Sequence, residues 1–175
     1  MTGAIMVAID GSEMANKALD LAAEFSAKLG APLHIVHVMF YARHAERLER
    51  LAQGENLVRE AAREVAPGAD VVQGQMAQIF NSLKTRAQSE RMVAAIGELL
   101  LDRAARRAKA KGATPIKTKL LNGDYAEAVL EEADRLKPRM MVVGRSGLGP
   151  LKSMVLGSVS HKIHAHAKCT VVTAR

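Results

Sequence analysis

The chain alternates between two patterns of apolar and polar residues. Five short, largely apolar runs predict strands, at residues 4–9, 32–39, 114–121, 139–143 and 169–173. The run at 4–9, AIMVAI, is unbroken, as expected for a strand that is buried on both faces of a sheet. The run at 114–121 alternates in part, which favours a less deeply buried strand.

Between most of these runs, apolar residues recur three and four positions apart, which predicts helices. Gly30 and Pro32 end the first helix, in the order usual for a helix carboxyl end. Asp124 is placed to cap a later helix, which Pro138 ends. A last helix is expected from about Ser158 to His166, just before the final strand.

Strands that alternate with helices predict a three-layer, doubly wound α/β fold, Rossmann-like, with five parallel strands in the order 3-2-1-4-5. Residues 40–111 are too many for one ordinary crossover. They are interpreted as a helix at about 42–65, a break at Pro67-Gly68 and a long helix ending near Lys111. We therefore expect a single domain over 1–175 with a helical insertion at 40–95, which either packs on the sheet edge or projects from it.

The formal net charge of the 175 residues is +7, which raises the question of nucleic acid. Arg103, Arg106 and Arg107 share one helix face, but no aromatic residues interleave with them to stack on bases. This pattern favours a solvated helix face, and no nucleic-acid partner is expected.

Cysteine usage and hydropathy indicate the cellular compartment. Cys169 is the single cysteine, so no intrachain disulfide or cysteine-rich metal site is predicted. No run of 18 or more apolar residues is present, and the first residues read as a core strand without a basic leader. These features favour a cytoplasmic protein with no membrane insertion.

The predicted topology provides one crevice for a ligand, beyond the carboxyl ends of strands one and four. Asp10 follows strand one and Gly144 follows strand four, so two distant loops would meet there. The sequence does not match the phosphate-binding loop motif G-x-x-x-x-G-K-[ST], because Pro150-Leu151 separates Gly149 from Lys152. The stretch GRSGLG has the wrong spacing and follows the wrong strand for the dinucleotide motif.

What remains is the spacing G-x2-G-x9-G-S, formed by Gly144, Gly147, Gly157 and Ser158. Together with the stretches VAIDGS and HIVHV, it resembles the nucleotide motif of the universal stress protein family, in its ATP-binding branch. The resemblance covers the chain apart from about 40–95. It implies ATP (or ADP or AMP) as ligand, with Mg²⁺, and a homodimer formed through the last strand. It also implies a stress-related regulatory protein that acts as a switch or scaffold on an unidentified client protein.

The resemblance also implies individual roles at the nucleotide site. Asp10 would lie against the ribose and adenine, and Val38 would contact adenine through its main chain. Gly144 and Gly147 would line the ribose and phosphates. Backbone N–H groups and hydroxyls of the GSVS stretch would hold the phosphates, with independent support from the anion affinity of a helix start. The implied set is Ala8, Ile9, Asp10, Val38, Val143, Gly144, Gly147, Gly157, Ser158, Val159 and Ser160. Ala8 and Ile9 stand where some ATP-binding relatives have a proline.

Three alternatives stay open. The first is a nucleotide-free dimeric scaffold that acts through the insertion. The second is a slow ATPase, but residues 144–160 contain no acid or glutamine that could orient a water molecule for hydrolysis. A hydrolase built from Ser158 or Ser160, His161 and Asp10 lacks the G-x-S-x-G elbow. The histidines at 161, 164 and 166 suggest a metal site, but their spacing favours surface histidines.

Overall fold

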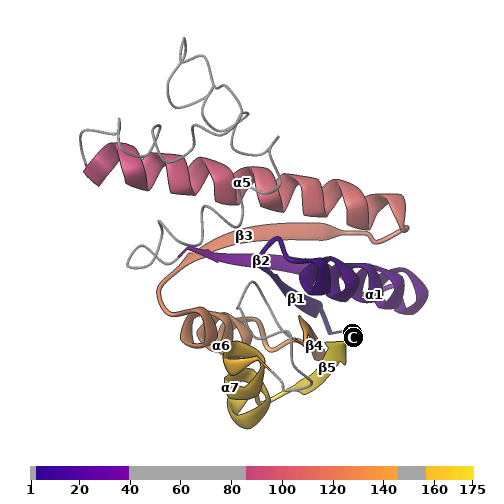
Figure 1. The fold of residues 1–175 in the computed structure, drawn as a ribbon. Coiled ribbons are helices and arrows are strands. Elements are labelled where there is room, and N and C mark those ends of the chain that lie inside the picture. The colour runs from indigo at the N-terminus through magenta and orange to yellow at the C-terminus, as the bar shows by residue number, and fades with distance from the viewer. Residues whose placement is uncertain (1–2, 40–85, 146–156) are drawn as a thin grey trace.

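The computed structural model describes residues 3–39, 86–145 and 157–175. Its five strands form one parallel sheet in the order β3-β2-β1-β4-β5 (Figure 1), which confirms the predicted fold class. The strands are β1 (Ile5–Ile9), β2 (Leu33–Met39), β3 (Ile116–Asn122), β4 (Met140–Gly144) and β5 (Thr170–Ala174). Their bounds lie within two residues of those predicted from the apolar runs.

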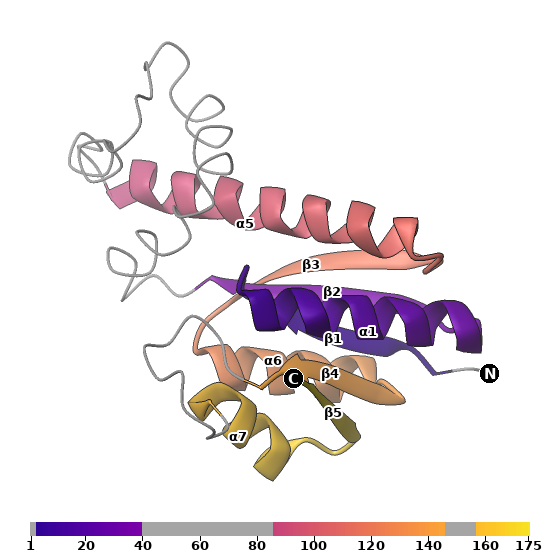
Figure 2. The ribbon, with the colours of Figure 1, turned by 45° about the vertical axis from the view of Figure 1, so that its right-hand side comes forward.

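Four described helices cover the two faces of this sheet, in three layers (Figure 2). They are α1 (Glu13–Leu29), α5 (Arg86–Ala110), α6 (Tyr125–Leu136) and α7 (Ser158–His166). Side chains of Ile5, Val7 and Ile9 pack with α1 and α5 on one face. The alternate side chains, such as Met6 and Val38, pack with α6 and α7 on the other face. The strand period of two thus separates two cores, as it should in a doubly covered sheet.

The helix ends follow the local chemistry of the sequence. The Ser12 hydroxyl accepts a 3.1 Å hydrogen bond from the Ala15 N–H and caps α1. Gly30 ends α1 in the left-handed conformation, at φ 59°. Asp124 caps α6 as predicted, but the carboxyl end of α6 is formed by Lys137, at φ 50°, one residue before Pro138.

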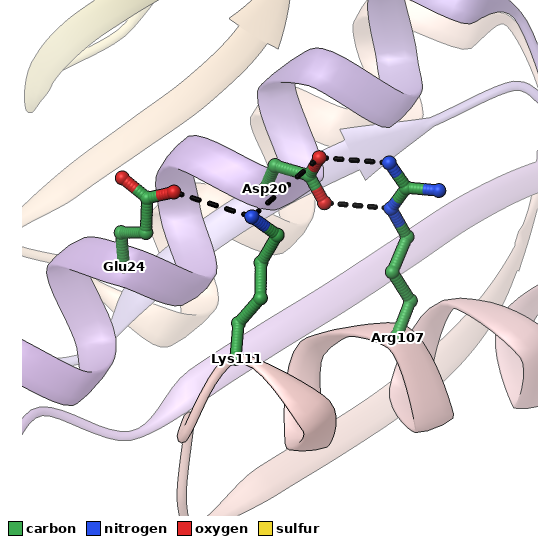
Figure 3. A network of polar contacts seen from close by, with 4 residues as sticks. All are labelled: Asp20, Glu24, Arg107 and Lys111. Atoms are coloured by element: carbon green, nitrogen blue, oxygen red, sulfur yellow. Dashed lines mark hydrogen bonds and ion pairs between the residues drawn. The ribbon is translucent and has the colours of Figure 1, made fainter.

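The long helix α5 is fastened to α1 by ion pairs (Figure 3). Arg107 donates two hydrogen bonds to the Asp20 carboxylate, at 2.6 and 2.7 Å. Lys111 lies 3.2 Å from Glu24 and 3.8 Å from Asp20. Much of the basic stretch that raised the question of nucleic acid is therefore engaged with carboxylates of the chain itself.

α5 ends one residue before the predicted Lys111. The remainder of the expected insertion, including the helix at 42–65 and the Pro67-Gly68 break, lies outside the described residues. Of the four helices described, none has both the length and the apolar composition that spanning a bilayer requires.

Candidate functional site at the carboxyl end of the sheet

The sheet is open between β1 and β4 at its carboxyl end. β1 and β4 lie side by side at the centre of the sheet, but their paired residues end at Val7 and Val142. On its other side β1 stays paired with β2 as far as Ile9, and β4 stays paired with β5 as far as Gly144. The last two residues of both central strands therefore border a gap in the ladder, at the place where ligands bind in open α/β sheets.

Asp10 lies at the β1 side of this opening, in the turn that leads into α1. Its Oδ1 accepts a 3.0 Å hydrogen bond from the Ser12 N–H, and Gly11 takes a positive φ of 81° to make the turn. The carboxylate is half-buried and belongs to a fixed turn. Each oxygen of a carboxylate can accept more than one hydrogen bond.

Gly144 lies at the β4 side, where the first turn of α1 comes very close. A Cβ placed on Gly144 would be 2.9 Å from the carbonyl carbon of Met14 and 3.0 Å from its oxygen. These are backbone atoms that cannot move aside as a side chain can. The absence of a side chain at Gly144 is thus required by packing, whatever else the residue does.

The start of α7 is joined to the end of β4 by hydrogen bonds. The Gly157 N–H donates to the Arg145 carbonyl at 2.9 Å, and the Ser160 hydroxyl donates to the Gly144 carbonyl at 2.6 Å. Ser158 is exposed, whereas Ser160 is buried. The two serines of the GSVS stretch therefore have different roles, because the Ser160 hydroxyl hydrogen is already engaged within the fold.

Gly157 is the N-cap of α7, and α7 has no side-chain cap hydrogen bond. Its φ of −61° and ψ of 153° are accessible to any residue, so backbone conformation does not demand glycine here. The first N–H groups of a helix lack partners within the helix and carry the positive end of its dipole. A bare N-cap gives an anion a direct approach to them.

The remaining predicted strand residues lie near the carboxyl ends of β1, β2 and β4. Ile9 is 8% exposed and packs against the α1 and α5 layer. Ala8, Val38 and Val143 pack on the α6 and α7 layer. Gly147 lies outside the described residues, so its role stays a prediction.

One residue at this edge, His37, has a structural role that was not predicted from the sequence. Its Nδ1 donates a 2.9 Å hydrogen bond to the Ile9 carbonyl, which links the ends of β2 and β1. The ring is buried, and its edge lies near the position of Gly97 on α5. His37 and His34 face opposite layers, since His37 lies near Gly97 of α5 and His34 interacts electrostatically with Glu132 of α6. A polar ring within an otherwise apolar strand was the available signal for a structural hydrogen bond.

His164, one of the three clustered histidines, has both ring nitrogens engaged. Nδ1 donates to the Ser160 carbonyl at 2.8 Å, so Nε2 accepts from the Thr173 hydroxyl at 3.0 Å when the ring is neutral. Within the described ranges, no group of three histidine, cysteine, aspartate or glutamate residues is arranged to hold a metal ion.

An open parallel α/β sheet with a strand-order switch is shared by a broad class of proteins, many of which bind ligands at that switch. Comparison with known proteins narrows this class. The profile of the universal stress protein family matches residues 1–175. The universal stress protein YxiE of Bacillus subtilis (strain 168) is 30% identical over 175 residues, which are 100% of each chain. The chain belongs to the universal stress protein family.

Solved structures support the fold. A universal stress protein in complex with cAMP is 24% identical, with 100% of this chain and 98% of that chain covered and a TM-score of 0.59. The universal stress protein of Archaeoglobus fulgidus in complex with dAMP is 18% identical, covering 99% and 98% of the two chains, with a TM-score of 0.55.

Proposed function

We propose that this protein binds an adenine nucleotide, ATP or its products ADP and AMP, in the opening between β1 and β4. The observation that carries the proposal is the early end of β1–β4 pairing, at Val7 and Val142, beside the bare start of α7. The cAMP and dAMP complexes of the two structural neighbours support an adenine ligand. Binding would make the protein a nucleotide-dependent switch or scaffold in a stress response.

The phosphates would lie at the first turn of α7. Backbone N–H groups of Ser158, Val159 and Ser160 would hold them, with the exposed Ser158 hydroxyl as a further donor. Ser160 would act through its main chain alone, because its hydroxyl donates to Gly144. Mg²⁺ would be held mainly by phosphate oxygens, with the Ser158 hydroxyl as the available protein ligand.

The nucleoside would lie at the β1 and β2 side. In a parallel strand, the N–H and C=O of one residue point to the same neighbour, and successive residues alternate. The Leu33 N–H donates to Pro115, toward β3, so the even-numbered residues of β2 direct their backbone groups toward β1. His37 is the last residue of β2 that is paired with β1, and Val38 comes directly after it. This position supports recognition of adenine by the main chain of Val38. Asp10 would accept hydrogen bonds from the ribose hydroxyls.

We also propose a homodimer through β5. β5 pairs with β4 along one edge, and no other described strand pairs with its second edge. Val171 and Val172 are half-buried there, and an open apolar edge favours pairing with another chain. Sedimentation at micromolar concentration should show a dimer, and a charge on that edge, as in Val172→Lys, should shift the mass to that of a monomer.

Hydrolysis of ATP would be slow. The stretch from 144 to 160 contains no acid or glutamine to orient a water molecule, and Asp10 would be at the nucleoside end. Turnover well below ~1 s⁻¹ is expected. Rapid, Ser158-dependent release of ADP in a single-turnover experiment would show instead that the protein is an ATPase.

The deciding experiment is calorimetric titration of the purified protein with ATP and AMP, together with analysis of any co-purifying nucleotide. Gly157→Leu should weaken binding by about tenfold or more, because its side chain would cover the helix start. Gly157→Ala restricts the backbone about as much as Gly157→Leu does but adds a smaller side chain. The alanine variant should therefore bind nucleotide more tightly than the leucine variant. A wild-type protein that binds no nucleotide at millimolar concentration would favour the nucleotide-free scaffold.

A further inference from the structure

A groove lies between α5 and the edge strand β3, away from the opening described above. Its volume is about 340 Å³. Four of its lining residues are spaced three and four apart on α5, so they form one helix stripe, and two belong to β3. They are Glu98, Leu101, Asp102, Ala105, Thr118 and Leu120. Figures 1 and 2 both show α5 running alongside β3.

The backbone of β3 faces this groove with open hydrogen-bonding groups. β3 ends the strand order, and no described strand pairs with its outer edge. Pro115 accepts from Leu33 and Gly123 donates to Met39, so the odd-numbered residues of β3 bond to β2. By alternation, the N–H and C=O groups of Thr118 and Leu120 point outward.

The side chains of β3 are also unusually exposed for this sheet. Lys117, Thr118 and Lys119 are exposed, whereas the central residues of β1, β2 and β4 are buried. Thr118 and Leu120 face the α5 layer, since they lie beside Ile35 and His37 in register. A row of outward backbone groups next to a helix stripe with the exposed side chains of Glu98 and Asp102 is an arrangement suited to binding an extended peptide by strand addition.

The two faces of this edge carry opposite charges. Glu98 and Asp102 line the groove on the α5 side. Lys117 and Lys119 occupy the alternate positions and therefore face the α6 layer, where Lys119 contacts Glu132 at 2.6 Å. Asp102 also contacts Arg106, in an exposed pair that an incoming cation can replace at little cost. A strand added here would meet negative charge on one face and positive charge on the other.

We propose that the groove between α5 and β3 binds an extended peptide segment of a partner protein, which adds to the sheet beside β3. Lysine or arginine side chains at alternate positions contact Glu98 and Asp102, with an apolar residue between them over Leu101 and Leu120. Acidic or polar residues occupy the other positions and face Lys117 and Lys119. This site requires neither the nucleotide nor the β5 edge.

The charge pattern can be tested with two labelled heptapeptides of identical composition. The first, Thr-Lys-Glu-Val-Glu-Lys-Thr, places lysine and valine on the groove face and glutamate on the other. The second, Thr-Glu-Lys-Val-Lys-Glu-Thr, exchanges the charges and serves as its control. Fluorescence anisotropy with the full chain should show the first binding about tenfold or more tightly than the second. Equal binding of the two, or binding of neither, would overturn the proposal.

Protein variants test the two faces of the site. Glu98→Lys with Asp102→Lys should abolish the preference for the first peptide, whereas Glu131→Lys, an exposed change on α6, should retain it. Thr118→Pro removes one outward N–H without touching the bonds to β2, so peptide affinity should fall about fivefold or more in a protein of unchanged melting temperature. Hydrogen exchange at Thr118 and Leu120 should slow when the first peptide binds. If the Thr118 variant instead changes the sedimentation mass and neither peptide binds, the groove is an interface between copies of this chain and the proposal is wrong.

Discussion

The Ser160 hydroxyl donates a 2.6 Å hydrogen bond to the carbonyl oxygen of Gly144. This bond joins the first turn of α7 to the last residue of β4, and Gly144 is paired with Ala174 of β5. His164 extends the connection, since it bonds both the Ser160 carbonyl and the Thr173 side chain. The start of α7, which we propose binds the phosphates, is therefore fixed to the carboxyl end of the sheet by a buried hydroxyl.

Exchanging each of the two serines for alanine should separate stability from nucleotide binding. Ser160→Ala removes a buried hydrogen bond and should lower the free energy of unfolding by about 1 kcal/mol. Ser158→Ala alters an exposed side chain and should change it by less than about 0.5 kcal/mol. Ser158→Ala should weaken the free energy of nucleotide binding by ~1–3 kcal/mol, because it removes a hydrogen bond to a charged phosphate group. Urea unfolding and calorimetric titration measure the two quantities. An unchanged stability in Ser160→Ala would contradict the structural role.

Gly144 should tolerate a methyl group far less well than Gly97 does. At Gly144 the new Cβ would lie 2.9 Å from backbone of Met14, so the start of α1 must move, at a cost of about 1–3 kcal/mol. At Gly97 the nearest atom, at 2.7 Å, is the tip of the Leu120 side chain, which can rotate away. Alanine is also the better helix former at that position within α5. Thermal unfolding of the two variants checks this order, and equal losses would show that the Met14 contact does not restrain Gly144.

The sequence predicted the strands and the helix caps because these depend on local chemistry and periodicity, whereas the strand order followed from the topology that alternating strands and helices adopt. Ser12, Gly30 and Asp124 could be assigned from their neighbours alone. The need for glycine at position 144 could not be assigned in this way, because it depends on where the first turn of α1 packs. The hydrogen bonds of Ser160 and His37 could not be predicted for the same reason, since each has its partner on a strand distant in sequence.

The bidentate pair between Asp20 and Arg107 should contribute modestly to the docking of α5 on α1. The hydrogen bonds from Arg107 hold the pKa of the Asp20 carboxyl below its usual range. Both side chains are partly exposed, at 25% and 49%, so a double-mutant cycle with Asp20→Ala and Arg107→Ala should give about 0.5–1 kcal/mol. The coupling should shrink in 1 M salt. The exposed pair of Glu13 and Lys17, 3.4 Å apart, is the matched control and should give a smaller coupling.

Glu132 should make stability depend on pH in the acid range. Hydrogen bonds from Arg135, together with Lys119, hold the pKa of the buried Glu132 carboxyl at about 2. Because the folded-state pKa is lowered, the contribution of Glu132 to stability is complete above the unfolded-state pKa of 4.5 and is lost as pH falls toward the folded-state value.

The test is the free energy of unfolding of the wild-type protein and of Glu132→Gln, measured in urea from pH 7 down to pH 3. The variant should be less stable at pH 7 by about 1–3 kcal/mol, reduced from the full pKa effect because Arg135 and Lys119 remain accessible to water. The difference should narrow steadily below about pH 4.5, as the wild-type carboxyl loses its advantage over the neutral amide. Glu131→Gln, which changes an exposed neighbour on α6, should show no such narrowing. A difference that stays constant from pH 7 to pH 3 would mean that packing of the glutamate side chain, rather than its charge, stabilises the contact between α6 and β3.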